Sequence, residues 1–190
     1  MEPISTNLPT EYGHFVMTVW KDLDGKEPLI LQTPNLNKLQ PVLVRVHSEC
    51  ITGDNFRSFK CDCGPQKELA LNLINHSQNG IFIYLRQEGR GIGLYEKIKA
   101  YQLQDTGYDT YDANIALGYL PDAREYSQVK MILDSLNISD IKLLTNNPDK
   151  VSAIQNLGIN VIERIDLITE SNEYNQNYIK TKKDRFKHYL

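Results

Sequence analysis

The sequence predicts an α/β fold, a single layered domain in which helices flank a mixed β-sheet. From residue 41 onward, short runs of β-branched and apolar residues alternate with longer runs of helical periodicity, which is the pattern of strand–helix units. Polar loops follow the predicted strands, and open α/β sheets bind their ligands at that edge. The chain has 190 residues, 41% of them hydrophobic and 24% charged, and this is enough for one sizeable core.

We expect the whole chain, 1–190, to form one domain with three parts. Residues 1–40 are predicted to form N-terminal strands and turns. Residues 41–170 are expected to form the core that carries the catalytic site, and 171–190 a C-terminal arm. The end of this arm, TKKDRFKHYL at 181–190, is basic, and we expect it to be solvated.

The first half of the chain is predicted to contain strands and then a helix. An apolar cluster at 15–20 and a short run at 29–33 predict two strands, with a turn at 23–28 between them. The β-branched run at 41–47 predicts a buried strand whose polar end leads into a loop with all three cysteines. A helix is predicted at 65–77, because apolar residues recur at helical spacing after a proline.

A charged glycine loop, RQEGRGIG at 86–93, separates a predicted strand at 81–85 from a predicted helix at 94–104. A strand, a glycine loop and a helix in this order present backbone N–H groups that can bind phosphate. Arg86 and Arg90 add forked guanidinium groups, which suit phosphate oxygens or a purine edge. The loop matches neither a Walker nor a Rossmann fingerprint, and a glycine turn with solvated charges is the alternative.

The second half of the chain repeats the alternation of elements. A helix is predicted at 124–136, a strand at 141–145, a helix at 149–158 and a last strand at 160–165. The stretch 104–126, which connects the helix at 94–104 to this half, is unusually polar for a connection inside an α/β unit.

Two groups of polar residues in this half are candidates for a site. Asp122 and Arg124 stand two apart, and at the lip of a pocket an aspartate can accept a proton while an arginine engages phosphate. The alternatives are a surface ion pair, or a helix cap made by Asp122. Thr145, Asn146 and Lys150 lie at another strand-to-helix loop, which also suits phosphate.

The three cysteines are the candidate metal ligands. Ten residues separate Cys50 from Cys61, and one separates Cys61 from Cys63. Three thiolates without a fourth cysteine are typical of a catalytic zinc, which keeps one coordination position for water or substrate. Two alternatives stay open: the cysteines are buried apolar residues, or His47 supplies a fourth ligand and the zinc is structural.

Composition excludes several classes of protein. A net charge of −3 argues against a dedicated nucleic-acid binder, whose domain is typically basic. The apolar runs are too short to span a bilayer, and the N-terminus lacks the apolar core of a targeting segment. We therefore expect a cytoplasmic enzyme, with no nucleic-acid partner and no membrane association, that acts on a phosphorylated small molecule.

Five segments carry a resemblance to a known family: RVHSECITGDNFRSFKCDCG, YLRQEGRGIGL, AYQLQDTGYDT, AREY and LLTNNPDKV. In this order and spacing, over roughly residues 8–188, the chain resembles GTP cyclohydrolase II of riboflavin biosynthesis. The resemblance implies that family's fold and the hydrolysis of GTP to 2,5-diamino-6-ribosylamino-4(3H)-pyrimidinone 5′-phosphate, formate and pyrophosphate, the first committed step of the pathway. Many bacteria fuse a dihydroxybutanone-phosphate synthase upstream, and without it we expect the monofunctional form.

The resemblance also implies cofactors and partners. Members of the family use zinc and Mg²⁺ and are usually dimers, so we expect one zinc per chain, Mg²⁺ with the GTP phosphates, and a homodimer. The final segment, KDRFKHYL, differs from the family's usual ending, and a role of the C-terminus in the site stays open.

Carried over by motif, the resemblance implies that Cys50, Cys61 and Cys63 hold the zinc. Water activated by this zinc would attack C8 of the guanine ring, and formate would leave after a second hydration. Arg124 would be the nucleophile on the α-phosphate, with Asp122 as proton acceptor. Because a guanidinium is almost always protonated, electrostatic clamping of the transition state is the alternative role for Arg124.

Further residues are implied at the substrate. Tyr101 matches an essential tyrosine of the family and would position the imidazole ring or the attacking water, with a core residue of a helix face as the alternative. Glu88 is a carboxylate in a phosphate loop, and we expect it to face guanine N–H donors or Mg²⁺. The family pattern places around GTP the residues Arg45, Val46, His47, Ser48, Glu49, Gln66, Glu88, Gly89, Arg90, Thr110, Thr145 and Lys150.

Two rival hypotheses remain at this level. The first is a divergent relative that releases pyrophosphate without opening the guanine ring, or that opens the ring of another nucleotide. The second is a zinc-dependent binding module for RNA that turns over no nucleotide. The products formed from GTP distinguish all three hypotheses.

Overall fold

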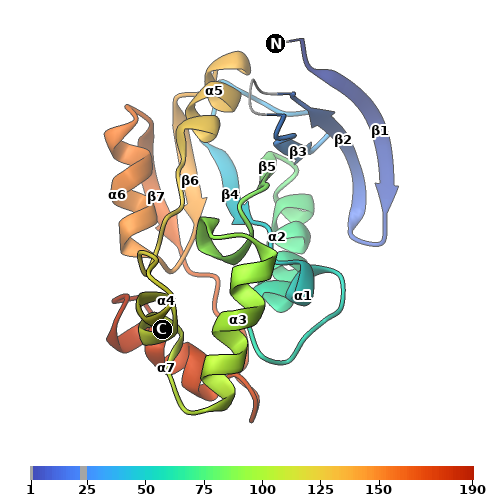
Figure 1. Ribbon diagram of the computed structural model, residues 1–190. Coiled ribbons are helices and arrows are strands. Elements are labelled where there is room, and N and C mark those ends of the chain that lie inside the picture. Colours follow the sequence, from blue (N-terminus) through green and yellow to red (C-terminus); the bar gives the residue numbers. More distant parts are fainter. Residues whose placement is uncertain (1, 22–24) are drawn as a thin grey trace.

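The computed structural model describes residues 2–21 and 25–190. Within them, one seven-stranded sheet has the order β1-β2-β3-β5-β4-β6-β7 (Figure 1). Pairing is antiparallel from β1 through β3 to β5 and parallel among β5, β4, β6 and β7, so the predicted mixed sheet is confirmed. The strands are β1 (Ile4–Thr10), β2 (Gly13–Val19), β3 (Leu29–Gln32), β4 (Val42–Ser48), β5 (Gly80–Leu85), β6 (Asp140–Leu144) and β7 (Asn160–Ile165).

Helices cover both faces of the sheet and gather at one end of it, where α3, α4 and α7 lie together (Figure 1). In the described ranges, no helix is both long and apolar enough to cross a membrane. The helices are α1 (Ile51–Asp54), α2 (Cys63–Ser77), α3 (Leu94–Asp105), α4 (Thr110–Ala116), α5 (Ser127–Ser135), α6 (Pro148–Asn156) and α7 (Gln176–Asp184), with a short 3₁₀ turn η1 (Glu88–Gly91).

The central strands β4 and β5 are buried on both faces, because helices cover both sides of the parallel part of the sheet. One face of β4, with Val44 and Val46, belongs to a core cluster with residues of α5 and α6. The opposite face of β5, with Phe82, packs with Ala70 and Ile74 of α2 in a second cluster. Side chains alternate along a strand. Polar residues of β4 that alternate with the valines therefore lie on the α2 side of the sheet.

Most predicted elements are present, with shifted ends. The strand predicted at 160–165 is β7, and the strand predicted at 81–85 lies within β5. The helix predicted at 124–136 begins only at Ser127, and the segment before it bonds to the glycine loop, where the N–H of Ala123 donates to the carbonyl of Arg90. The turn predicted at 23–28 lies partly outside the described residues.

The polar stretch at 104–126 contains α4, a helix that sequence reasoning did not predict. Asp109 caps this helix and accepts hydrogen bonds from the backbone N–H groups of Tyr111 and Asp112. Aspartate is a preferred N-cap residue, since its side chain bonds the free N–H groups of the first turn. The polar residues therefore mark the start of a helix.

The expectation of a solvated arm at 181–190 is wrong for part of that segment. Thr181 and Lys182 are buried in α7, and the backbone N–H of Tyr189 donates to the carbonyl of Asn146 at 2.8 Å. The exposed residues Lys183 and Lys187 keep only the outer surface of the segment in water. The C-terminal segment thus packs on the carboxyl edge of the sheet.

Candidate active site

A pocket lies beyond the carboxyl ends of β4, β5 and β6. Every site residue expected from the sequence lines it except Val46 and Asp122. The Val46 side chain is fully buried in the core, and its carbonyl accepts a hydrogen bond from Lys150. Asp122 bonds to Arg124, which does line the pocket.

The three cysteine sulfurs meet on one side of this pocket. All of them lie within 4.8 Å of one another, and the Cys50 and Cys61 sulfurs are 3.7 Å apart. Two sulfurs bound to one tetrahedral zinc at about 2.3 Å each are about 3.8 Å apart. Cys50 and Cys61 are buried and Cys63 is half-buried, so the donor set fits a zinc ion.

Gly53 leaves the cysteines the room to meet. A Cβ at this position would lie 2.9 Å from the Cys61 sulfur and 3.2 Å from the Cys50 sulfur. It would also lie 3.0 Å from Cys63 Cβ, and real Cβ atoms essentially never approach others more closely than this. Sequence reasoning missed Gly53, although a glycine three residues after Cys50 was a signal.

The thiols of the cluster affect one another's protonation. Hydrogen bonds with Cys61 and Cys63 lower the pKa of Cys50, against its burial, and Lys97 lowers it further. The hydrogen bond with Cys50 raises the pKa of Cys61 to about 12, and the pKa of Cys63 rises as well. One thiolate therefore accepts hydrogen bonds from two thiols, and a bound cation would displace the remaining protons.

His47 does not join the sulfurs. In the described part of the chain, the cluster of possible ligands contains only the three cysteines. His47 Nε2 lies 3.0 Å from an oxygen of Asp54, and the ring stacks on Phe82 and Tyr84. Burial lowers the pKa of His47, so the ring is neutral, and its Nδ1 is buried without a partner.

Cations form the other side of the pocket. Arg45 donates to the carbonyl of Leu144 at 3.0 Å and to Gln66 at 2.9 Å, while its Nε has no partner. Burial lowers the pKa of Arg45 to about 10 and also lowers that of Lys150. One N–H group of Arg90 is buried without a partner as well. Such unpaired buried donors cost free energy unless a ligand accepts from them.

Asp122 and Arg124 form an ion pair at this side. Arg124 Nε donates to Asp122 at 2.8 Å, and a second nitrogen of Arg124 contacts the other carboxylate oxygen. Despite burial, the bonds from Arg124 lower the pKa of Asp122, and the electrostatic interaction with Tyr126, together with the bond to Asp122, raises the pKa of Arg124. The helix-cap alternative is wrong, because residue Tyr126 occupies the N-cap of α5.

Tyr101 and Glu88 come from α3 and from the glycine loop. Tyr101 lines the pocket, and burial raises the pKa of its hydroxyl, which stays protonated. Both Glu88 oxygens already accept hydrogen bonds inside the protein, from Lys97 at 2.8 Å and from the N–H of Ile51 at 2.6 Å. Glu88 is therefore buried and paired, whereas Arg86 of the same loop is exposed, so the alternative of solvated charges holds for only part of the loop.

The remaining carried-over residues also surround the pocket. Ser48 accepts from Gln87, and Glu49 pairs with the exposed Arg86 at 3.3 Å. Thr110 is the first residue of α4 and Thr145 directly follows β6, and both line the pocket. Gly89 has a φ of 63°, a left-handed conformation that glycine adopts without strain.

The C-terminal segment closes the pocket from one side, and sequence reasoning missed it. Lys182 of α7 bonds Asp62, which stands between two cysteines and accepts from Gln66 at 2.7 Å. Phe186 lies under the Arg90 guanidinium at 4.1 Å. Tyr178 and His188 complete this wall of the pocket. No sequence motif marks these residues, whereas Lys97 could have been found from its helical spacing to Tyr101.

Comparison with known proteins gives a consistent result. A family model described as GTP cyclohydrolase II matches residues 2–166. "GTP cyclohydrolase-2" of Acinetobacter baylyi is 50% identical over 186 residues, which cover 97% of this chain and 93% of the relative. The Neisseria meningitidis serogroup B protein of the same name is 48% identical over 98% of this chain and 94% of its own length.

A solved structure of a two-domain 3,4-dihydroxy-2-butanone 4-phosphate synthase, RibBX from A. baumannii, aligns with a TM-score of 0.45 and 20% identity. The alignment covers 89% of this chain and 40% of that one. The family model and the near-full-length relatives, in contrast, span the cysteine cluster and the cationic loops of the pocket. The chain belongs to the GTP cyclohydrolase II family.

Proposed function

We propose that this protein hydrolyses GTP to 2,5-diamino-6-ribosylamino-4(3H)-pyrimidinone 5′-phosphate, formate and pyrophosphate, the first committed step of riboflavin biosynthesis, in the cytoplasm. Zinc held by three cysteines and Mg²⁺ bound with the GTP phosphates would be the cofactors. The family assignment supports the substrate. The pocket supports the two-part reaction, because it combines a site for metal with a site for phosphate.

The single observation that carries this proposal is the set of unpaired cationic N–H groups beside the sulfurs. Buried nitrogens of Arg45 and Arg90 lack partners, and Lys150 is buried among like charges. A polyphosphate supplies both the acceptors and the negative charge that this arrangement needs. The guanine ring of the same nucleotide would then point to the cysteine side.

At the ring end, Cys50, Cys61 and Cys63 would hold the zinc. When bound there, zinc supplies Lewis acidity and a nucleophilic water for opening the imidazole ring. Tyr101 keeps its proton because burial raises its pKa, so its hydroxyl can donate to the ring or hold the attacking water in place. His47 is neutral, and its free Nδ1 can accept a hydrogen bond from the substrate.

At the phosphate end, hydrolysis breaks the bond between the α- and β-phosphates and leaves new negative charge on pyrophosphate. Arg124, Arg90 and Lys150 can stabilise that charge. Arg124 is held protonated by its pairing with Asp122, and a nucleophilic role would require it to lose that proton. We therefore favour the electrostatic clamp, with the ionised Asp122 accepting a proton from the attacking water.

The experiment measures formate, pyrophosphate and zinc together after purified protein is incubated with GTP and Mg²⁺. Equal amounts of formate and pyrophosphate, at about one zinc per chain, are expected. Pyrophosphate without formate from zinc-loaded protein would favour the divergent relative. Neither product, together with tight binding of RNA, would favour the binding module.

We also propose a homodimer, as the family resemblance implies. Light scattering of the purified protein should give twice the mass of 21.8 kDa. A monomer at assay concentration, with full activity, would contradict this.

A further inference from the structure

We propose that Lys97 is a positioning residue of the metal site, whose ammonium contacts the Cys50 sulfur and sets how strongly that sulfur donates electrons. Glu88 holds the ammonium in place. This inference rests on the proposed function in one respect, since it assumes a metal ion at the three cysteines. It gives Glu88 a role at the metal site, where the family pattern places it at GTP.

Lys97 directs its ammonium at the sulfur with no donor left over. Its Nζ lies 3.1 Å from Cys50 Sγ, 2.9 Å from Thr52 Oγ1 and 2.8 Å from Glu88 Oε1. An ammonium has three N–H donors, and each therefore has one acceptor here. Only 10% of the Lys97 side chain is exposed, so the contact is made away from bulk water.

Glu88 connects the same ammonium to the backbone beside the cysteine. Its second oxygen accepts from the N–H of Ile51 at 2.6 Å, the residue that follows Cys50. On the other side, Asp54 accepts from the N–H of Cys50 at 3.0 Å. Cys50 is thus held through its sulfur by Lys97 and through its backbone by two carboxylates. Outer partners of this kind orient metal ligands and tune their basicity.

The charges favour an electronic role over a purely structural one. The Lys97 ammonium lies between the Cys50 sulfur, at 3.1 Å, and the Glu88 carboxylate, at 2.8 Å. The Lys97–Glu88 pair is oriented with its positive end on the sulfur. Three thiolates make a bound zinc electron-rich, and a cation in contact with one of them reduces its donation. The pair thereby keeps the metal a stronger Lewis acid.

Lys99 offers a matched control on the same helix. It lies two residues further along α3, where it pairs with Glu96 at 3.0 Å, and 43% of its side chain is exposed. Lys99→Met removes the same charge from the same helix without touching the cysteines. A Lys97→Met effect that Lys99→Met does not reproduce therefore reports the sulfur contact.

The test uses full-length protein loaded with Co²⁺ in place of zinc, whose sulfur-to-metal charge-transfer band reports the electron donation of the thiolates. Lys97→Met should move this band to lower energy, because the sulfur loses its cation and keeps the Glu88 carboxylate nearby. Glu88→Gln should move the band to higher energy, because the negative charge of Glu88 is lost while the positive charge of Lys97 stays beside the sulfur. A merely structural role would not give shifts of opposite sign.

Activity provides the second readout. Formate release by zinc-loaded Lys97→Met should fall about 10- to 100-fold, chiefly in kcat, while Lys99→Met matches the wild type. An unchanged band and an unchanged formate rate in Lys97→Met would overturn the inference, as would shifts of the same sign in both variants. If wild-type protein shows no sulfur-to-cobalt band, the metal site itself fails. If Lys97→Met does not fold, the sign of the Glu88→Gln shift decides.

Discussion

At the scale of single residues, the chemistry of the pocket depends on small distances between side chains. Gly53 illustrates this, because a Cβ atom at its position would come within 3.2 Å of all three cysteines. The hydrogen bond between His47 and Asp54 has a similar effect, since it keeps the imidazole away from the sulfurs. The three cysteines are therefore a set of possible ligands without the imidazole, and a zinc ion bound to them would keep one coordination position for another group.

We expect Gly53→Ala to weaken metal binding. The added methyl group would lie 2.9 Å from the Cys61 sulfur and 3.2 Å from that of Cys50, so the cluster must open. Overpacking of this kind costs about 1–3 kcal/mol of stability. Zinc content after dialysis against a weak chelator should fall, while urea unfolding shows a folded protein. Full zinc retention would contradict the close packing of α1 on the cluster.

We expect Cys61→Ser to separate the two halves of the reaction. Loss of a ligand should remove zinc, and formate release should drop below about one hundredth of the wild-type rate, since second-shell partners alone are worth 10- to 100-fold. Pyrophosphate release should persist in part, because Arg124 and Lys150 do not contact the sulfurs. The two products, measured with zinc content, check this; full formate output would refute the metal assignment.

His188 should make the protein acid-sensitive. Burial, then Lys182, Arg124, Arg90 and Lys150, lower its pKa from 6.5 to about 3. Between pH 6.5 and pH 3, His188 is protonated in the unfolded chain but stays neutral in the folded protein. The free energy of unfolding therefore falls on acidification in this range, by about 1.4 kcal/mol per pH unit.

A His188→Gln variant isolates this contribution. Urea unfolding between pH 7 and pH 4 should show a shallower loss of stability than in the wild type. His47 is present in both proteins and cancels in the comparison. Parallel pH profiles would mean that His188 titrates normally and does not face the cations.

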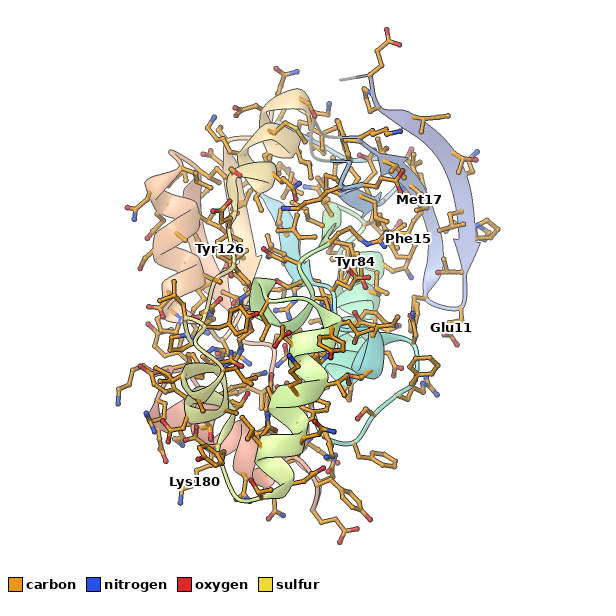
Figure 2. The ribbon with its side chains drawn as sticks, in the orientation of Figure 1. Glu11, Phe15, Met17, Tyr84, Tyr126 and Lys180 are labelled. Atoms are coloured by element: carbon orange, nitrogen blue, oxygen red, sulfur yellow. The ribbon has the colours of Figure 1, made fainter. Side chains whose placement is uncertain are left out.

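At the scale of elements, each side of the pocket comes from a different part of the chain. β4 brings Arg45 and His47 on the α2 side of the sheet, and α3 brings Lys97 and Tyr101 one turn apart. The C-terminal helix α7 lies opposite, with its outer residue Lys180 pointing into solvent (Figure 2). The pocket is therefore complete only when α7 is docked.

We expect Lys182→Met to loosen that docking. Lys182 and Asp62 form a buried ion pair, and removal of one partner leaves the other charge buried, at a cost of about 3–5 kcal/mol. The bond from Gln66 to Asp62 should keep the loss near the low end. The KM for GTP should rise, because the wall that carries Phe186 becomes mobile.

The exposed neighbours on the same helix provide the control. Lys180→Met and Lys183→Met remove the same charge from solvated positions and should stay within about 0.5 kcal/mol of the wild type. Urea unfolding measures the stability of Lys182→Met and of the two control variants, and initial rates give the KM for GTP of each. Equal effects in all three variants would show that total charge, and not the bond to Asp62, is responsible.

At the scale of the whole molecule, the strand pattern could be predicted because β-branched runs such as 41–47 must be buried under two helical layers. The cysteine cluster could be predicted too, because three cysteines with this spacing are typical ligands of one zinc ion. What failed depends on long-range contacts. The burial of Lys182 requires Asp62, which is 120 residues away. The Glu88 carboxylate is used by Lys97 and Ile51, and no local pattern reveals that.

The molecule carries a net charge of −3, yet its pocket concentrates cations whose N–H groups lack partners. Holding these positive charges together lowers the stability of the folded protein, and a bound anion should restore it. We expect pyrophosphate, a product of the proposed reaction, to stabilise the protein against heat. At a concentration of 100 times its Kd, the gain is about 2.7 kcal/mol, which for a chain of this size raises Tm by roughly 5–10 °C.

Two comparisons make this a test of the pocket and not of ionic strength. Sodium chloride at matched ionic strength should shift Tm far less, because it screens exposed charges without reaching buried N–H groups. Arg45→Met should abolish most of the pyrophosphate shift, whereas Lys130→Met, which removes a surface cation paired with Asp134, should preserve it. A shift of equal size in all three proteins would mean that pyrophosphate binds elsewhere. If the shift is lost only in Arg45→Met, the phosphate end of the substrate lies beside Gln66, at the carboxyl end of β4. Gln66 in turn donates to Asp62 of the cysteine loop, so this position is close to the three sulfurs.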